Sequence, residues 1–225
     1  MTEKSEVRIQ QRFYWLSNTI FHQVLAVTCG FIFYIFFKSH DLTSARFLHN
    51  FLASGAYIPL MAEGFILFTE SNVWSLEANR SIKGWVHGAL LTVSVICASV
   101  GIIIEINAKN QSSSPHFHTL HAKLGLASWI MCFSLVLSGL LTVYAAKLRN
   151  YVKPLYIKLF HEIVGLACFG TGVYSLYLGL PKWGFASYVT ASELTATKTL
   201  VIIVAVWSVL GSCVSIFNNI KNVFT

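Results

Sequence analysis

Four histidines occupy equivalent places in this sequence, each at the start of a long apolar run. They are His49, His87, His121 and His161. An ionisable side chain inside a membrane helix is costly to bury, so its presence is by default a functional hypothesis. Neutral imidazole is the commonest metal ligand in proteins, and its second ring nitrogen is usually held by another hydrogen bond. Four imidazoles at corresponding positions therefore predict metal ligands better than they predict four unrelated polar residues at a membrane interface.

The segment around the last of these histidines, KLFHEIVGLACFGTGVY (158–174), is also rich in small residues. These are Gly165, Ala167, Gly170 and Gly172. Small residues let a neighbouring helix approach closely, and they also leave room for a flat and bulky group beside the helix. The sequence alone leaves both interpretations open.

The elements that must position the histidines are membrane helices. Of the 225 residues, 55% are hydrophobic and only 11% are charged, whereas soluble domains carry about 25% charged residues. Six apolar runs are long enough to cross a bilayer, which takes about 20 residues. They cover roughly 14–37, 47–69, 84–105, 121–146, 159–181 and 199–220. They do not alternate as barrel strands do, so we predict an all-α membrane protein with six transmembrane helices in one domain, residues 1–225.

The order of the helices predicts how the histidines pair. Consecutive spans run in opposite directions, so His49 and His121 lie at one membrane face and His87 and His161 at the other. Each pair can clamp one flat macrocycle with an imidazole on each side of its iron. Both axial positions are then filled, which suits electron transfer rather than oxygen activation. We therefore expect the second to fifth helices to form a four-helix bundle around two haems, one near each side of a layer about 30 Å thick.

Other signals restrict the function further. No CxxC or CxxCH motif is present, so the haems are expected to be non-covalent. No Walker, Rossmann, HExxH or GxSxG pattern occurs, and we assign no catalytic side chain. The net charge of +7 is spread between the apolar runs, which favours lipid head groups over nucleic acid as the partner.

The distribution of Lys and Arg predicts the orientation. Ten of these residues fall on the side of the two termini and six on the other side, so both termini are expected to be cytoplasmic. The sequon Asn110-Gln111-Ser112 then lies on the non-cytoplasmic side, where it can be glycosylated. A second sequon at Asn79 lies on the cytoplasmic side and is expected to be unused.

Four segments carry a resemblance to a known family. They are LMAEGFILFTES (60–71), KGWVH (83–87), HTLHAKLGL (118–126) and KLFHEIVG (158–165). With these segments the chain resembles the cytochrome b561 family over nearly its whole length, and most closely the small branch of cytochrome b561 domain-containing transmembrane reductases. The resemblance implies a single cytochrome b561 domain and two b haems with bis-histidine ligation. His49 and His121 match the ligands of the non-cytoplasmic haem, and His87 and His161 match those of the cytoplasmic haem.

The resemblance also implies a reaction. Electrons would enter from cytosolic ascorbate and leave to monodehydroascorbate or ferric iron on the other side, in an endomembrane (endoplasmic reticulum or vesicle) or the plasma membrane. A homodimer is implied as well. The chain departs from many relatives at Leu48-His49-Asn50, where they have Trp-His-Pro, and this departure concerns the donor more than the haem ligands.

Candidate substrate residues lie near both ends of the predicted bundle. Arg80, Lys83, Lys153 and Lys158 flank the His87/His161 end. They are expected to attract an anionic donor, although a positive-inside topology alone also explains them. At the other end His116 and His118 are candidates for accepting protons or binding ferric iron, with a solvated loop as the alternative.

Two further polar residues and two further functions stay open. His22 is expected to be hydrogen-bonded inside the bundle, with a role as haem ligand as the alternative. Glu63 is expected to be a hydrogen-bonded structural residue near the head-group level, with proton handling as the alternative. The alternative functions are a metal-ion or proton transporter whose histidines bind substrate, and a haem-bearing anchor subunit that passes electrons to quinone.

Overall fold

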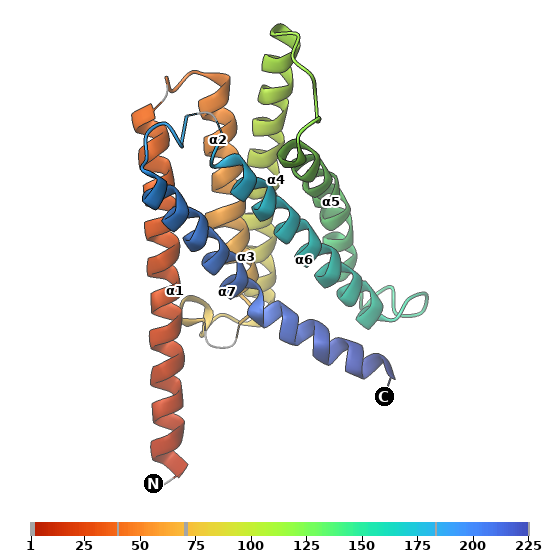
Figure 1. Cartoon of the computed structure of the whole chain (residues 1–225). Coiled ribbons are helices and arrows are strands. Elements are labelled where there is room, and N and C mark those ends of the chain that lie inside the picture. The colour runs from red at the N-terminus through yellow and green to blue at the C-terminus, as the bar shows by residue number, and fades with distance from the viewer. Residues whose placement is uncertain (1–2, 40, 70–71, 183, 225) are drawn as a thin grey trace.

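The computed structural model describes residues 3–39, 41–69, 72–182 and 184–224, and over these residues the chain is helical with connecting turns. The elements are α1 (Glu3–Ser39), α2 (Ala45–Gly55), η1 (Ala56–Met61), α3 (Ala62–Ile66), η2 (Val73–Ser75), α4 (Arg80–Gln111), α5 (Leu120–Val143), α6 (Pro154–Gly179) and α7 (Ala191–Phe224). Both termini lie at the same end of the molecule (Figure 1). We call this the termini end. The end of the matching segment 60–71 at Glu70–Ser71 lies outside the described residues.

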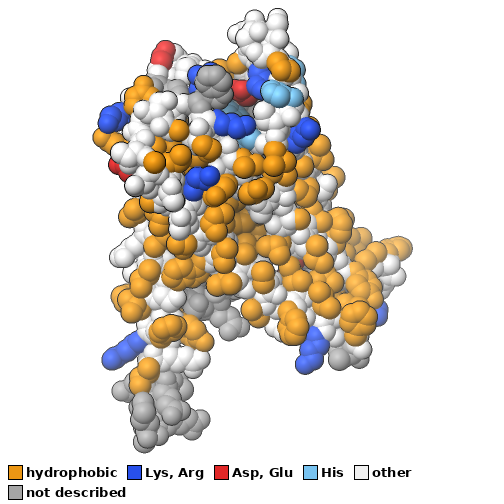
Figure 2. All heavy atoms as spheres, viewed as in Figure 1, with side chains coloured by type: hydrophobic (Ala, Val, Ile, Leu, Met, Phe, Trp, Pro, Cys, Tyr) orange, Lys and Arg blue, Asp and Glu red, His pale blue; other side chains and the backbone are white. Residues whose placement is uncertain are grey.

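The helices have the length and composition of membrane spans. Five of them (α1, α4, α5, α6 and α7) are long and apolar enough to cross a bilayer. The sixth predicted span is the continuous helical stretch α2–η1–α3, residues 45–66, which is divided by a change of helix type. Hydrophobic side chains cover the middle of the molecular surface, and Lys and Arg gather towards the two ends (Figure 2). The prediction of an all-α, multi-pass membrane protein is confirmed.

The change of helix type occurs at the proline of the second span. Pro59 lies inside the π-helical segment Ala56–Met61. Proline has no backbone N–H and cannot donate the i→i−4 hydrogen bond of an α-helix. The chain accommodates this proline with a wider helical turn, a feature found frequently at functional sites. This segment carries Tyr57, which is only 5% exposed and therefore points into the bundle.

Helix caps fix where the histidines fall along each span. The side chains of Ser44, Asn79 and Thr119 each accept a hydrogen bond from a backbone N–H in the first turn of α2, α4 and α5, respectively. Pro154 occupies the first turn of α6, where its missing N–H costs nothing. All four histidines follow these starts within about two turns, and so they lie near the ends of the helices.

The core consists of two helix pairs. One pair is α4 with α2 and its continuation, and the other is α5 with α6, whose packing against each other is the most extensive in the fold. Direct packing between α4 and α5 is limited, and η1 contacts α6 across the middle of the bundle. α7 packs on α6 and α3, and α1 packs on α7. The two helix pairs therefore face each other across a gap that side chains of η1 bridge at mid-height.

Candidate functional site

The structure brings the four histidines together in two pairs. The rings of His49 and His121 have centroids 6.3 Å apart and planes at 90°. The rings of His87 and His161 have centroids 6.2 Å apart and planes at 66°. In each case one ring comes from the α2/α4 side and the other from the α5/α6 side, which is the pairing expected from helix order.

The spacing fits two imidazoles on one metal ion. A metal–nitrogen bond to histidine is about 2 Å long, and each ring centroid lies about 1 Å behind its nitrogen, so two imidazoles on opposite sides of one ion have centroids about 6 Å apart. The observed distances of 6.3 and 6.2 Å match this value. Each pair can therefore supply two ligands from opposite sides without a change in the positions of the helices.

Hydrogen bonds orient the rings at the end opposite the termini. His49 Nδ1 lies 3.0 Å from the Gly101 carbonyl, and His121 Nδ1 lies 2.8 Å from the Ser175 carbonyl. A carbonyl oxygen only accepts, so each Nδ1 carries the proton and Nε2 is the nitrogen left with a lone pair. Gly179 lies close to the His121 ring, since an added Cβ would come within 3.0 Å of its Cε1 atom.

The same arrangement occurs at the termini end. His87 Nδ1 lies 2.9 Å from the Gly64 carbonyl, and His161 Nδ1 lies 3.0 Å from Ser138 Oγ. Ser138 Oγ donates to a backbone carbonyl on its own helix, so it accepts from the His161 ring. Gly139 leaves room for this ring, because an added Cβ would lie 3.4 Å from the His161 Cε1 atom. All four rings are thus held through Nδ1, which leaves the Nε2 lone pair available, the orientation typical of ligating histidines.

The two pairs are separated along the bundle by about four helical turns. On α6, His161 precedes Ser175, the partner of His121, by 14 residues, and on α4 His87 precedes Gly101, the partner of His49, by the same number. At 1.5 Å per residue both helices give a separation of about 21 Å. The two pairs therefore fit within a hydrocarbon layer about 30 Å thick, one near each side.

A buried cluster fills the space halfway between the pairs. Cys168 lies on α6 midway between His161 and Ser175, with its Sγ atom 3.5 Å from that of Cys132 on α5. Ser128 Oγ donates to the Cys168 carbonyl and lies 2.7 Å from the Tyr57 hydroxyl. These contacts join η1, α5 and α6 at mid-height and hold the two helix pairs together between the two sites.

The predicted donor-side cations lie at the termini end. Arg80 and Lys83 belong to the first turn of α4, and Lys153 is the exposed residue at the start of α6. Lys158 differs from the other three because it pairs with Glu162 on the same helix, at 3.6 Å. The structure therefore gives Lys158 an intramolecular partner that sequence reasoning did not identify.

The predicted acceptor-side histidines lie in the α4–α5 connection. His116 and His118 are both exposed. His116 Nε2 lies 2.8 Å from Asn110 Oδ1, a contact that closes the connection onto the last turn of α4. Both residues are at the same end as His49 and His121, as predicted.

His22 and Glu63 are joined by a hydrogen bond between α1 and α3. His22 Nδ1 lies 2.8 Å from Glu63 Oε1, and its Nε2 lies 3.4 Å from Asn72 Oδ1. Asn72 donates its amide N–H to a backbone carbonyl, which fixes Oδ1 as the atom that faces His22. The predicted hydrogen bonding of His22 and Glu63 inside the bundle is confirmed.

Sequence reasoning missed the residues that accept from the histidine Nδ1 atoms. These are Gly64, Gly101, Ser138 and Ser175. Two of them had a signal in the sequence, because Gly101 and Ser175 follow a histidine on the same helix by 14 residues. That interval is close to four full turns and places the small residue and the histidine on the same helix face.

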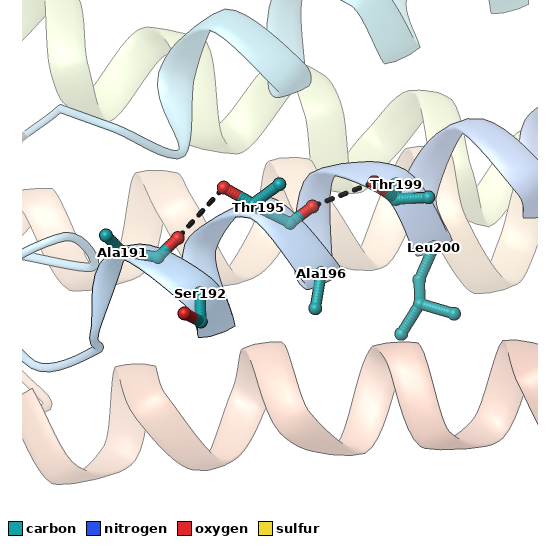
Figure 3. A pocket seen from close by; sticks show the side chains of 6 residues that line it. All are labelled: Ala191, Ser192, Thr195, Ala196, Thr199 and Leu200. Carbon is teal, nitrogen blue, oxygen red and sulfur yellow. Dashed lines mark hydrogen bonds between the residues drawn. The ribbon is translucent and has the colours of Figure 1, made fainter.

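A separate hollow lies beside the start of α7 (Figure 3). It is lined by Ala191, Ser192, Thr195, Ala196, Thr199 and Leu200. Thr195 and Thr199 donate their hydroxyls to backbone carbonyls one turn earlier. None of the six lining residues is charged or is one of the four paired histidines, so the hollow is not part of the histidine sites.

Comparison with known proteins identifies the family. The model of eukaryotic cytochrome b561 matches residues 48–187, a range that includes all four paired histidines. The transmembrane reductase CYB561D2 of mouse is 27% identical over 164 residues, which are 73% of each chain, and that of human is 26% identical over 166 residues, 74% of each. The human protein named probable transmembrane reductase CYB561D1 is 25% identical over 154 residues, 68% of this chain and 67% of its own. The chain therefore belongs to the cytochrome b561 family.

Proposed function

We propose that this protein is a di-haem transmembrane oxidoreductase that passes electrons across the membrane from a donor at the termini end to an acceptor at the opposite end. The observation that carries the proposal is the presence of two histidine pairs with metal-ligand spacing, about 21 Å apart along the bundle. One pair alone would serve a single buried centre. Two pairs at opposite ends provide a route through the bilayer.

The donor set favours haem b over a metal ion held by protein alone. Each pair offers two nitrogen ligands, and among the described residues no group of three or more His, Cys, Asp or Glu side chains could hold a metal ion. The four nitrogens of a porphyrin would complete the coordination, with His49 and His121 holding one haem and His87 and His161 the other. When bound, a haem with two histidine ligands supplies one-electron transfer and offers no open position to oxygen. We assign the single transmembrane domain to residues 1–225.

The basic residues at the termini end support an anionic donor. Arg80 and Lys83 lie there in the first turn of α4, and Lys153 is the residue that immediately precedes α6. Cationic side chains around an entrance raise the local concentration of anions and speed their association. We therefore propose cytosolic ascorbate as the donor, with both termini cytoplasmic as the charge distribution predicts.

The acceptor side is the end that carries His49 and His121. We propose monodehydroascorbate or a ferric chelate as the acceptor, with the exposed His116 and His118 available to exchange protons or contact the chelate. The protein would act as a ferric or monodehydroascorbate reductase of an endomembrane or the plasma membrane, with homodimers as the expected assembly.

Haem content of single-histidine variants tests the proposal. The purified protein is expected to contain two b haems that ascorbate reduces, and His161→Ala and His49→Ala should each contain one. His116→Ala is the matched control, since this histidine lies outside both pairs, and it should retain two. A folded protein without haem would contradict the proposal and would favour metal-ion or proton transport.

Transport of electrons is tested in vesicles. Vesicles loaded with ascorbate and carrying the protein are expected to reduce external ferric citrate, and both His161→Ala and His49→Ala should abolish this reduction. If vesicles that carry the protein with both His161→Ala and His49→Ala reduced ferric citrate as fast as wild-type vesicles, electrons would not pass through the histidine sites.

A further inference from the structure

The residue that follows one of the proposed haem ligands in the sequence is a glutamate. Glu162 follows His161 on α6, and its side chain is turned towards α7. Its Oε1 atom accepts from Ser215 Oγ at 2.8 Å, and its Oε2 atom accepts from Asn219 Nδ2 at 2.6 Å. Asn219 is 7% exposed and Glu162 and Ser215 are half-buried, so this network is partly buried between α6 and α7 although it lies near the termini end.

Glu162 forms an ion pair with Lys158, one turn earlier on the same helix. The Lys158 ammonium lies 3.6 Å from Glu162 Oε1 and donates to Asn219 Oδ1 at 3.4 Å. The lysine side chain is 39% exposed and the glutamate side chain 17%, so solvent screens the positive charge more than the negative one. Lys158 also lies one turn nearer the start of α6. The carboxylate is therefore the charge that acts more strongly on the neighbouring imidazole, with which it interacts electrostatically.

We propose that Glu162 is a fixed counter-charge that lowers the redox potential of the haem held by His87 and His161. The inference rests on the proposed function, because it requires a haem at this pair. A haem iron gains one negative charge on reduction, so a nearby carboxylate stabilises the oxidised form and disfavours the reduced form. Three hydrogen bonds or ion-pair contacts hold the carboxylate in place, and a fixed charge in a partly buried site acts more strongly than a mobile charge in water. Lys158 acts in the opposite direction, and its charge is screened more strongly because its side chain is more exposed.

The charge of Glu162 also favours one direction of electron transfer. Electrons are proposed to enter at the His87/His161 end and to leave at the His49/His121 end. A lower potential at the entry haem makes the step to the second haem more favourable. At the second site the charged groups that act on His121 are of both signs, Lys182 and Glu105. Charges of both signs are thus present at each site, and at the entry site the carboxylate is the less exposed member of its pair.

Spectroelectrochemical titration of the purified two-haem protein tests this inference. Glu162→Gln keeps the size and one acceptor oxygen but removes the charge. At a fixed applied potential it should lower the oxidised-to-reduced ratio of one haem about tenfold, a rise of about 59 mV for a one-electron couple, and leave the other haem unchanged. Lys158→Gln should move the same haem in the opposite direction by a smaller amount.

Three further variants separate charge from structure. Glu162→Asp keeps the charge and should retain the low potential, whereas Ser215→Ala removes a hydrogen bond without changing charge and should cause at most a small shift. Glu105→Gln is the matched control at the other site and should leave the His87/His161 haem unchanged. The inference is overturned if Glu162→Gln leaves both potentials unchanged, or if Ser215→Ala shifts the potential as much as Glu162→Gln does. Absence of two haems in the wild-type protein would instead contradict the proposed function.

Discussion

The close approach of Tyr57 to Gly172 gives a stability prediction that can be worked out from the structure. A Cβ atom added at Gly172 would lie within 2.6 Å of three atoms of the Tyr57 ring. The ring is buried and its hydroxyl is bonded to Ser128, so it cannot turn away without losing that hydrogen bond. Gly172→Ala therefore overpacks the centre of the bundle.

The expected loss of stability has three parts. Overpacking a well-packed core costs about 1–3 kcal/mol, and a lost hydrogen bond of this kind adds about 0.5–1.5 kcal/mol. Replacing glycine by alanine in a helix offsets about 1 kcal/mol of this. The net destabilisation is therefore about 0.5–3.5 kcal/mol, with a central value of about 2 kcal/mol that corresponds to a Tm lower by about 4–8 °C for a chain of this size.

Thermal unfolding in detergent, followed by circular dichroism, measures the effect. Gly170→Ala is the matched control, because no heavy atom lies within 4 Å of an added Cβ at this position on the same helix. It should leave Tm unchanged or raise it. In the Gly172→Ala background, Tyr57→Leu should restore stability and Tyr57→Phe should not, since phenylalanine keeps the ring. A Gly172→Ala protein as stable as the Gly170→Ala control would refute the reasoning.

Three other predictions follow from the sites and loops. His22→Gln removes the contact between its imidazole and Glu63 and should destabilise the protein by about 1–3 kcal/mol with two haems still bound, as measured by unfolding and haem content; loss of a haem would assign this residue to a site. Asn110→Gln should abolish a glycosidase-sensitive shift on gels of the protein made in eukaryotic cells, and an unchanged shift would contradict the proposed orientation. Replacing Arg80 and Lys83 together by Gln should raise KM for ascorbate about tenfold but leave KM for an uncharged donor unchanged; equal effects on both donors would rule out electrostatic attraction.

The number of spans and the pairing of the histidines could be predicted from sequence because both depend on local signals. A run of about 20 apolar residues marks a span, and alternating directions then decide which histidines share an end. The lengths of the helices could not be predicted in the same way. α4 continues to Gln111, whereas the apolar run ends near residue 105, since polar helical turns beyond the membrane leave no hydropathy signal.

The hydrogen bonds between helices could not be predicted reliably from the sequence, for a different reason. The acceptors Gly101 and Ser175 use their backbone carbonyls, which every residue possesses, so residue type gives no indication of that role and the 14-residue spacing from a histidine gives only a weak one. The pairing of Lys158 with Glu162 has the i,i+4 spacing of a helical ion pair, but the contribution of Asn219 from α7 depends on how two helices pack. The interpretation of Lys158 as a substrate residue overlooked this local alternative.

The distribution of hydrogen bonds explains why the two sites should behave independently. Each histidine bonds through Nδ1 to the other member of its own helix pair, α2–η1–α3 with α4, or α5 with α6. The proposed metal bonds instead run between the two pairs. At mid-height the pairs are joined by the Tyr57–Ser128 contact and by the rings of Phe65 and Phe169, whose centroids are 4.8 Å apart.

Because the two helix pairs are joined between the two sites, loss of a cofactor at one end should leave the spacing of the two histidines at the other end unchanged. The ring orientations do not depend on the cofactor, because the Nδ1 bonds lie within each helix pair, and the spacing is held by the central contacts together with the hydrogen bond from Trp129 Nε1 to Ser99 Oγ. This is the physical reason to expect His161→Ala to lose one haem and keep the second. If the centre is weakened, as in Gly172→Ala, the gap is no longer fixed and both sites should bind haem less tightly. Comparison of haem retention in the two variants therefore separates loss of a ligand from loss of the spacing on which both sites depend.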